Sequence, residues 1–146
     1  MSDIYNSQLV EERPLTGSSY DPDLSGKTIL VVEDNYSNFY LLKVHLNKLK
    51  ANVIHSRNGQ EAIESFRNNN IDLVLMDLKM PEMNGYDAMK AIKSIRPDVI
   101  IIAQTAFAMS GDREKALARG FDDYLTKPIR KSELAHYMQK YLTSKE

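Results

Sequence analysis

Short apolar runs alternate with longer amphipathic stretches from Lys27 onward, and this alternation limits the possible folds more tightly than any single motif. Apolar runs of about four to eight residues are typical of buried strands, and longer stretches with apolar residues three or four positions apart are typical of helices. Repeated pairs of strand and helix predict an α/β protein with a parallel sheet. The expected strands are residues 27–33, 52–56, 71–77, 98–105 and 121–126.

A helix is expected after each of these strands, because apolar residues recur at helical spacing in every intervening stretch. Pro97 is expected to end the third helix, and Gly120 the fourth, which begins near Ser110 with Asp112 and Glu114 in its first turn. The expected apolar faces are Phe39, Leu42, Leu46 and Leu49; Ala62, Ile63 and Phe66; Ala88, Ile92 and Ile95; and Leu134, Met138 and Leu142.

Length and composition favour one soluble, cytoplasmic domain. The 146 residues suit one core, and a formal net charge of -1 creates no strong field toward nucleic acid or an anionic membrane. The chain has no cysteine, which excludes disulfides, thiolate metal sites and a cysteine nucleophile. Apolar runs stay well below the roughly 20 residues that a bilayer requires. We therefore expect no direct contact with nucleic acid or membrane.

Residues 1–26 are expected to form a flexible tail or linker, because Pro, Gly and Ser interrupt them and no apolar periodicity persists. The predicted domain covers residues 27–143, and residues 144–146 are expected to be a short carboxyl-terminal tail. No second domain is expected.

The apolar run at 71–77 ends on a carboxylate, Asp77. A charge inside a buried strand costs several kcal/mol unless it is paired, so Asp77 is expected either at the very end of the strand or beside specific partners. Asp72 lies near the opposite end of the same strand and is expected to be a solvated strand start.

Other polar residues follow the ends of the neighbouring strands: Glu33 and Asp34 the first, Thr105 the fourth, and Lys127 the fifth. Right-handed crossovers make these strands parallel, so their carboxyl ends gather at one edge of the sheet, where ligands usually bind. Each residue also has an ordinary structural interpretation, such as a helix cap by Asp34 or Asn35. Their joint occurrence at one edge favours a functional site.

The residue types predict the chemistry of that site. Clustered carboxylates repel one another unless a cation neutralises them, and a ligand set made of oxygen suits Mg²⁺ or Mn²⁺. Asp77 could then attack phosphorus as a carboxylate nucleophile, while Thr105 and Lys127 supply a hydrogen bond and a positive charge to the phosphoryl oxygens. The product would be an aspartyl phosphate.

The motifs "ILVVEDN", "LVLMDLKMPEMNG", "IIAQTA" and "GFDDYLTKPI", in this order, resemble the response regulator receiver domain of two-component signalling. The resemblance covers roughly residues 27–143, and the segment "TAFAMSGDREKALARGFDDYLTKPI" is most similar to receivers of hybrid sensor histidine kinases. It implies a flavodoxin-like, doubly wound sheet of five parallel strands in the order 2-1-3-4-5, flanked by five helices.

The same resemblance implies a role for each matching residue. Asp77 would be the phosphoacceptor and, with Asp34, a direct metal ligand; Glu33 would act through water, and the backbone carbonyl of Lys79 would be a further ligand. Thr105 would be the switch hydroxyl, Lys127 the phosphate-binding lysine, and Tyr124 the switch aromatic residue. A cis peptide bond is expected before Pro128.

The implied function is that of a phosphoacceptor in a phosphorelay, without catalytic turnover beyond its own phosphorylation and slow dephosphorylation. A sensor histidine kinase would donate the phosphoryl group, and a downstream phosphotransfer or effector protein would respond. The domain would be a monomer or a weak dimer. We also hypothesise that bulky Phe107 shields the acyl phosphate from water and slows its hydrolysis.

Two other classes of protein use similar sequence features. A haloacid dehalogenase-like phosphatase would also use Asp77 as a magnesium-dependent nucleophile, but it requires a second acid two residues later, where this chain has Lys79. A flavodoxin-like carrier of FMN would require a loop rich in glycine and hydroxyl groups after the first strand, where "VVEDNYSN" presents acids that repel phosphate.

Overall fold

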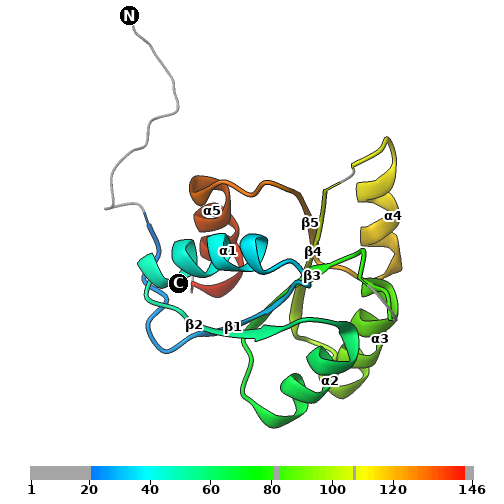
Figure 1. Cartoon of the computed structure of the whole chain (residues 1–146), viewed down its shortest axis with the longest axis horizontal. Coiled ribbons are helices and arrows are strands. Elements are labelled where there is room, and N and C mark those ends of the chain that lie inside the picture. Colours follow the sequence, from blue (N-terminus) through cyan, green and yellow to red (C-terminus); the bar gives the residue numbers. More distant parts are fainter. Residues whose placement is uncertain (1–20, 81–82, 107, 144–146) are drawn as a thin grey trace, which may run out of the picture.

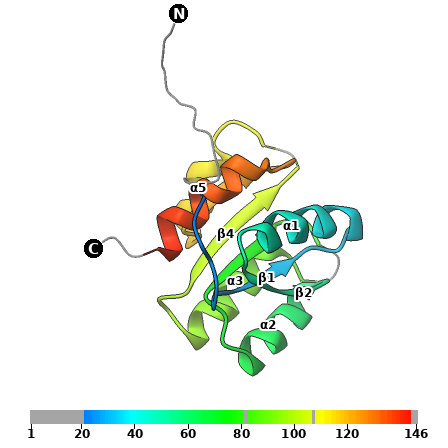
Figure 2. The same ribbon diagram turned by 90° about the vertical axis from the view of Figure 1, so that its left-hand side faces the viewer.

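The structure is a computed structural model that describes residues 21–80, 83–106 and 108–143. Within these residues, five parallel strands form one sheet in the order β2-β1-β3-β4-β5, and helices cover both faces (Figures 1 and 2). The strands are β1 (Thr28–Val32), β2 (Asn52–Ser56), β3 (Leu73–Asp77), β4 (Ile100–Thr105) and β5 (Asp123–Thr126). The helices are α1 (Tyr36–Lys48), α2 (Gly59–Asn68), α3 (Gly85–Ile95), α4 (Asp112–Arg119) and α5 (Lys131–Leu142). The predicted fold class and strand order are confirmed.

Two apolar cores flank the sheet because successive side chains of a strand point to opposite faces. Leu30 and Val74 pack with residues of α2, α3 and α4, whereas Ile29 and Leu75 pack with residues of α1 and α5. All five residues of β3 are buried, which explains why its sequence is a continuous apolar run instead of an alternating one. The sheet therefore holds the end of β3 rigidly between two cores.

Asparagine side chains begin three of the helices at the edge where the strands end. Asn35, Asn58 and Asn84 each accept a hydrogen bond from the backbone N–H three residues later. Such a cap stabilises a helix by about 1 kcal/mol. Of the two candidates for the first cap, the structure therefore uses Asn35, which leaves the carboxylate of Asp34 for another role.

Several local expectations need correction. The fourth helix begins at Asp112, two residues after the expected start near Ser110 and directly after Gly111 in a left-handed conformation, and Asp112 and Glu114 lie in its first turn as predicted. Ile95 was expected on the apolar face of α3, but it is 41% exposed at the end of the helix. Met89, which was not predicted to lie on this face, is buried in the middle of the helix. Asp72 is not simply solvated, because its carboxylate accepts a hydrogen bond of 2.8 Å from the N–H of Thr28.

The expected tail at 1–26 overlaps the packed domain. Leu24 is fully buried in the core beside α1, and its N–H donates to the carbonyl of Leu49 at 2.8 Å. A single leucine in a polar stretch has no periodic partners, so sequence pattern could not identify it. Residues 1–20 and 144–146 lie outside the described residues. Among the described helices, none is long and apolar enough to cross a membrane.

Candidate functional site

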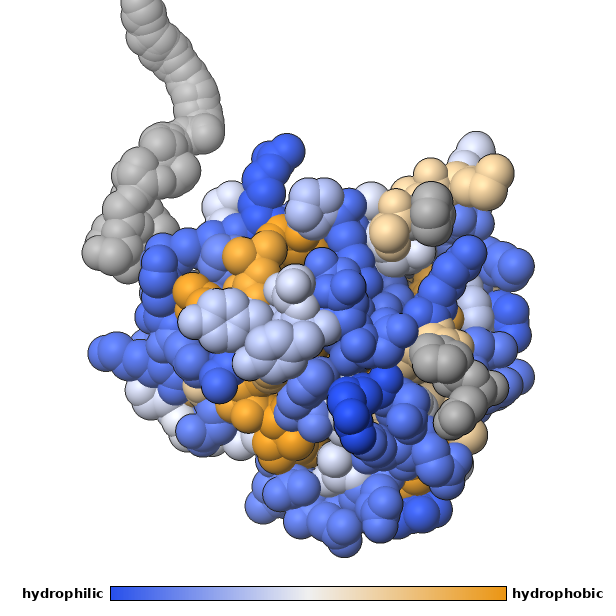
Figure 3. Space-filling model, in the orientation of Figure 1, coloured by the Kyte–Doolittle hydropathy of each residue, from blue (hydrophilic) through white to orange (hydrophobic). Residues whose placement is uncertain are grey.

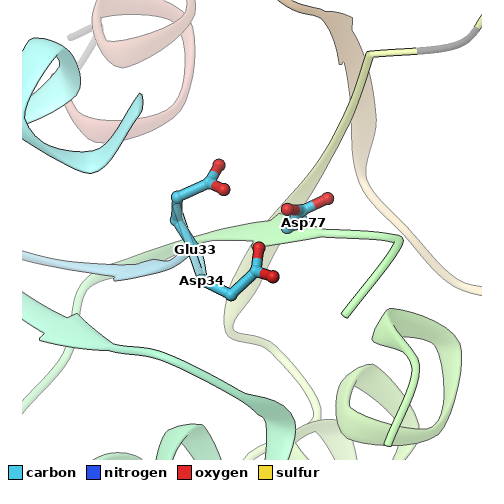
Figure 4. Close-up of side chains that lie close together, drawn as sticks. All are labelled: Glu33, Asp34 and Asp77. Atoms are coloured by element: carbon cyan, nitrogen blue, oxygen red, sulfur yellow. The ribbon is translucent and has the colours of Figure 1, made fainter. Parts of the chain in front are cut away.

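Three carboxylates meet at the carboxyl ends of β1 and β3 (Figure 4). One oxygen from each of Glu33, Asp34 and Asp77 lies within 4.8 Å of the others. Glu33 and Asp77 are buried, whereas Asp34 is exposed. The structure thus brings together the three acids that the sequence analysis placed at this edge. We call these three residues the acid site.

Lys127 reaches the acid site from the end of β5. Its ammonium donates to Glu33 Oε1 at 2.6 Å and to Asp77 Oδ2 at 3.1 Å. The peptide bond from Lys127 to Pro128 is cis, as expected, and the Lys127 N–H donates to the carbonyl of Thr105 at 2.8 Å. The lysine is therefore fixed to the end of β4 while its charge faces the carboxylates.

The charges of the acid site oppose one another. Burial raises the pKa of Glu33, and the charge of Asp77 adds to that effect, although the hydrogen bond from Lys127 works against it. Burial alone would lower the pKa of Lys127, but its hydrogen bond with Glu33 and the charge of Asp77 raise it instead. Lys127 therefore stays protonated, and its single charge cannot balance three ionised carboxylates. Such an excess of carboxylate oxygen favours a hard divalent cation.

Backbone groups orient the carboxylate of Asp77. The other oxygen of Asp77, Oδ1, accepts a hydrogen bond from the N–H of Lys79 at 3.1 Å. Gly85 is needed nearby, because a Cβ at this position would lie 2.5 Å from the carbonyl oxygen of Asp77. The loop after β3 therefore approaches the site closely enough to hold the Asp77 side chain in one orientation.

His55 supports the end of the first strand, a role that the sequence pattern did not predict. Its Nε2 lies 2.8 Å from the carbonyl oxygen of Glu33, and its ring stacks on Phe39 with 3.7 Å between the ring centroids. The carboxylate of Glu33 also accepts a hydrogen bond from the N–H of Asn35 at 3.1 Å. Contacts with β2 and with the start of α1 thus fix the end of β1.

The two predicted switch residues lie in β4 and β5. Thr105 is the last residue of β4 and is 4% exposed. Tyr124 is 7% exposed and packs in the core beside α3 and α4, and its hydroxyl has no hydrogen-bond partner among the described residues. Burial, with the charge of Asp112, raises the pKa of Tyr124. Phe107 lies outside the described residues, so its proposed shielding role stays a prediction.

A third buried carboxylate, that of Asp123, was not identified from the sequence. It is 1% exposed, and the available signal was an acid inside a strand pattern, the same signal that singled out Asp77. Its oxygens accept hydrogen bonds from Arg113 at 2.9 Å, Tyr141 at 2.7 Å, Lys140 at 3.4 Å and the N–H of Tyr124 at 3.0 Å. We call Asp123, Arg113, Lys140 and Tyr141 the Asp123 cluster.

Comparison with known proteins decides between the predicted classes. The family model of the response regulator receiver domain matches residues 29–139. The chain belongs to this family. As a receiver domain, it is similar to part of LuxN, the autoinducer 1 sensor kinase/phosphatase of Vibrio campbellii, with 37% identity over 116 residues. These cover 79% of this chain but only 13% of LuxN, so the chain spans a small part of that relative. The haloacid dehalogenase-like alternative finds no support in these comparisons.

Two solved structures resemble this receiver domain. One is the receiver domain of the sensor histidine kinase PA1611 from Pseudomonas aeruginosa, with a magnesium ion coordinated in its active-site cleft. It shares 37% identity and a TM-score of 0.75, and the match covers 82% of this chain and all of that one. The other is the receiver domain of Ssk1 from Saccharomyces cerevisiae, in complex with the histidine phosphotransfer protein Ypd1. It shares 32% identity and a TM-score of 0.73, and the match covers 83% of this chain and 90% of that one.

Proposed function

We propose that this receiver domain accepts a phosphoryl group on Asp77 from the phosphohistidine of a sensor histidine kinase or phosphotransfer protein, in a reaction that needs Mg²⁺. One observation carries the proposal: the Asp77 carboxylate ends a buried strand within 4.8 Å of two further carboxylates and bonds to the Lys127 ammonium. This arrangement combines a nucleophile, a cation site and a positive charge for phosphoryl oxygens.

The residues present suit a magnesium ion. Asp34 and Asp77 would bind it directly, Glu33 through water, and Lys79 through its backbone carbonyl. Oxygen donors of this kind match the preference of Mg²⁺, and the similar receiver domain of PA1611 contains this ion in its cleft. When bound, the ion would neutralise charge on the carboxylates and on the incoming phosphoryl group. Mn²⁺ has the same preference for oxygen and is proposed as a substitute.

In the reaction, an oxygen of Asp77 attacks the phosphorus atom, the bond from phosphorus to the imidazole nitrogen breaks, and the nitrogen keeps the electron pair. The phosphoryl group adds roughly 1.5 to 2 negative charges at pH 7. Lys127 then exchanges a carboxylate for a phosphoryl oxygen, and the Thr105 hydroxyl donates to another. Tyr124 packs in the core with Ala116 of α4, so these shifts would change the surface that α4, β5 and α5 present to partners.

The partner that donates the phosphoryl group would dock on α1. Tyr36, Tyr40 and Leu41 on this helix are 64%, 53% and 43% exposed, and Tyr36 follows the cap residue that adjoins the acid site. Figure 3 shows apolar surface over α1 and α5 on a face that is otherwise mainly hydrophilic. Exposed apolar side chains of this kind mark interaction sites. The complex of the Ssk1 receiver with Ypd1 supports a partner of the phosphotransfer class.

Incubation with acetyl phosphate and Mg²⁺ tests the proposed reaction without any partner. The wild-type chain should gain one phosphoryl group that hydroxylamine removes, because an acyl phosphate is labile to this nucleophile. Asp77→Asn should gain none, whereas Asp72→Asn, which alters the acid at the other end of the strand, should behave as the wild type. An adduct that persists in Asp77→Asn, or that forms equally in EDTA, would refute the assignment.

A further inference from the structure

Methionine is the residue type through which an oxidant can act on this chain. The sequence has no cysteine and no tryptophan but 7 methionines, and peroxides oxidise the thioether sulfur of methionine to a sulfoxide. Exposure decides which of them react. Met109 is 73% exposed, and Met80 and Met83 are partly exposed. Among the described residues, the other methionines are at most 2% exposed: Met76, Met89 and Met138.

Met83 occupies a space that Gly59 leaves open. A Cβ atom at Gly59 would lie 2.9 Å from the sulfur of Met83, 3.0 Å from its Cγ and 3.1 Å from the Cβ of Ala88. Gly59 is the first residue of α2, Ala88 lies in the first turn of α3, and both are buried. The two helices cover the same face of the sheet (Figure 1). The thioether of Met83 therefore joins the starts of α2 and α3, and we call this packing the methionine contact.

The backbone before and after Met83 holds the carboxylate of Asp77 in place. The N–H of Lys79 donates to Asp77 Oδ1 at 3.1 Å. The N–H of Gly85 donates to the carbonyl oxygen of Leu78 at 3.2 Å. Leu78 and Met83 are both partly buried and pack against the core beneath α2 and α3. The methionine contact therefore helps to fix the two hydrogen bonds on which the orientation of Asp77 depends.

We propose that Met83 is an oxidation site through which hydrogen peroxide lowers phosphorylation of the domain. This inference rests on the proposed function. A lone pair of the Met83 sulfur attacks one oxygen of the peroxide, a bond forms between sulfur and that oxygen, and the O–O bond breaks. The sulfur loses two electrons, and the other oxygen leaves as hydroxide, which takes the proton of the attacked oxygen and becomes water. The product is methionine sulfoxide.

Oxidation weakens the methionine contact. The sulfur and Cγ of Met83 already fill the space at Gly59, so the sulfoxide oxygen points to solvent, where water binds it. A hydrated, polar group no longer gains from packing against the apolar core, and the side chain moves outward. The hydrogen bond from Lys79 to Asp77 then loosens, and the carbonyl of Lys79, a proposed metal ligand, shifts with it. Both changes should slow the reaction that needs Mg²⁺.

Two variants separate Met83 from the other accessible methionines. Met80→Leu combined with Met109→Leu keeps Met83, whereas Met83→Leu removes it with little change in volume. After treatment with hydrogen peroxide, the wild type and the first variant should react with acetyl phosphate and Mg²⁺ about tenfold more slowly, the usual loss when a group that orients a metal ligand is disturbed. Met83→Leu should keep its rate. Methionine sulfoxide reductases should restore the rate of the wild type, and mass spectrometry of peptides locates the added oxygen.

Hydrogen exchange tests the contact without any phosphoryl donor. Oxidation should accelerate exchange of the Lys79 and Gly85 N–H groups in the wild type but not in Met83→Leu. The N–H of Arg96, which is bonded at the far end of α3, should exchange at an unchanged rate. Gly59→Ala should accelerate exchange of the same two groups without an oxidant, because its Cβ would displace the flexible Met83 side chain.

The outcomes distinguish the two proposals. The oxidation site is overturned if Met83 gains no oxygen, if oxidised Met83→Leu slows as much as the wild type, or if phosphorylation slows while exchange stays the same. Unchanged exchange in Gly59→Ala also overturns it, since the methionine contact would then not hold the backbone. Failure of acetyl phosphate to modify the untreated wild type refutes the proposed function itself, and hydrogen exchange still decides whether Met83 oxidation loosens the backbone beside Asp77.

Discussion

The acid site and the Asp123 cluster each contain a buried carboxylate at a strand of the same sheet, but their electrostatic character is opposite. In the acid site, Glu33 and Asp77 share the ammonium of Lys127 beside a third carboxylate, that of Asp34, and burial raises the pKa of Glu33. In the Asp123 cluster, one carboxylate receives hydrogen bonds from a guanidinium, an ammonium, a phenol and a backbone N–H. The acid site has less positive charge than its three carboxylates require, whereas the Asp123 cluster has more than its single carboxylate requires.

This difference indicates what each cluster does. Burial alone would raise the pKa of Asp123, but the hydrogen bonds from Tyr141 and the Tyr124 N–H, together with the charge of Arg113, hold it below its ordinary value. Asp123 is therefore satisfied without a ligand and joins α4 and α5 to β5. The acid site has no such compensation among the described residues, as the proposed binding of a cation and a phosphoryl group requires. We therefore interpret Asp123 as a structural acid and the acid site as the functional one.

Removing the satisfied carboxylate should have the largest effect on stability. Asp123→Ala removes the carboxylate that accepts from two cations, from the Tyr141 phenol and from the buried Tyr124 N–H, although the phenol keeps the Asp122 carbonyl as an acceptor, so the free energy of unfolding should fall by about 3 kcal/mol in urea denaturation. The control Asp98→Ala, whose carboxylate is 90% exposed, should cost less than about 0.5 kcal/mol. If Asp98→Ala cost as much as Asp123→Ala, the hydrogen bonds of Asp123 would add no stability, and the Asp123 cluster would not be the structural one.

A cation bound at the acid site should raise the free energy of unfolding by an amount comparable to the loss in Asp123→Ala. Mg²⁺ at 100 times its dissociation constant should raise the free energy of unfolding by about 2.7 kcal/mol over the value in EDTA, because it binds the folded state alone. Asp34→Ala, which removes a proposed ligand, should lose most of this gain, whereas Asp123→Asn should keep it. Calorimetric melting with and without Mg²⁺ measures both. An equal gain in Asp34→Ala would show that the ion binds elsewhere.

The acid site could be predicted from the sequence because its members end separate strands, and topology alone brings strand ends together. Asp77 stood out as a charge at the end of an apolar run, and Glu33, Asp34, Thr105 and Lys127 followed from the same rule. The strand order came from resemblance to a family, and both were confirmed by the structure and the comparisons. The roles of the individual residues stay predictions.

The Asp123 cluster could not be predicted in the same way. Its members come from α4, β5 and α5, and whether Arg113 or Tyr141 faces the strand depends on how each helix is rotated against the sheet. Helical periodicity identifies the apolar stripe of a helix but not which flanking polar residue reaches a buried acid. The pairing of His55 with the Glu33 carbonyl was missed for a related reason, since it depends on the register of β2 against β1.

Neutralising an acid of the uncompensated site should stabilise the metal-free protein. Glu33→Gln keeps one acceptor oxygen for the Lys127 ammonium but turns its NH₂ group toward the Asn35 N–H, so one hydrogen bond is lost. The removed charge should outweigh this loss, and we expect the variant to be more stable at pH 7 by up to about 1 kcal/mol. The pKa of Glu33 is raised in the folded wild type, so the ionisation of Glu33 lowers the stability of the fold. The wild type is therefore most stable below the unfolded pKa of about 4.3, and it loses stability as the pH rises through the folded pKa. The difference should therefore vanish below about pH 4. A variant less stable than the wild type at pH 7 would contradict this sign.

The smallest predicted effect concerns a single hydrogen bond of the Asp123 cluster. The Tyr141 hydroxyl donates to Asp123 at 2.7 Å, and burial together with this bond raises the pKa of Tyr141. Tyr141→Phe should cost about 1 kcal/mol, because a hydrogen bond to a charged acceptor is lost with little change in shape. The cost should shrink when Asp123→Asn is also present, since the charge is then gone; a double-mutant cycle in urea measures this coupling.

At pH values below the folded pKa of Asp123 the coupling should fall further, because a depressed pKa contributes stability only where the carboxylate is ionised. Equal costs in both backgrounds would mean that the phenol packs against the strand without sensing the charge, and the Asp123 cluster would then be held by its cations alone.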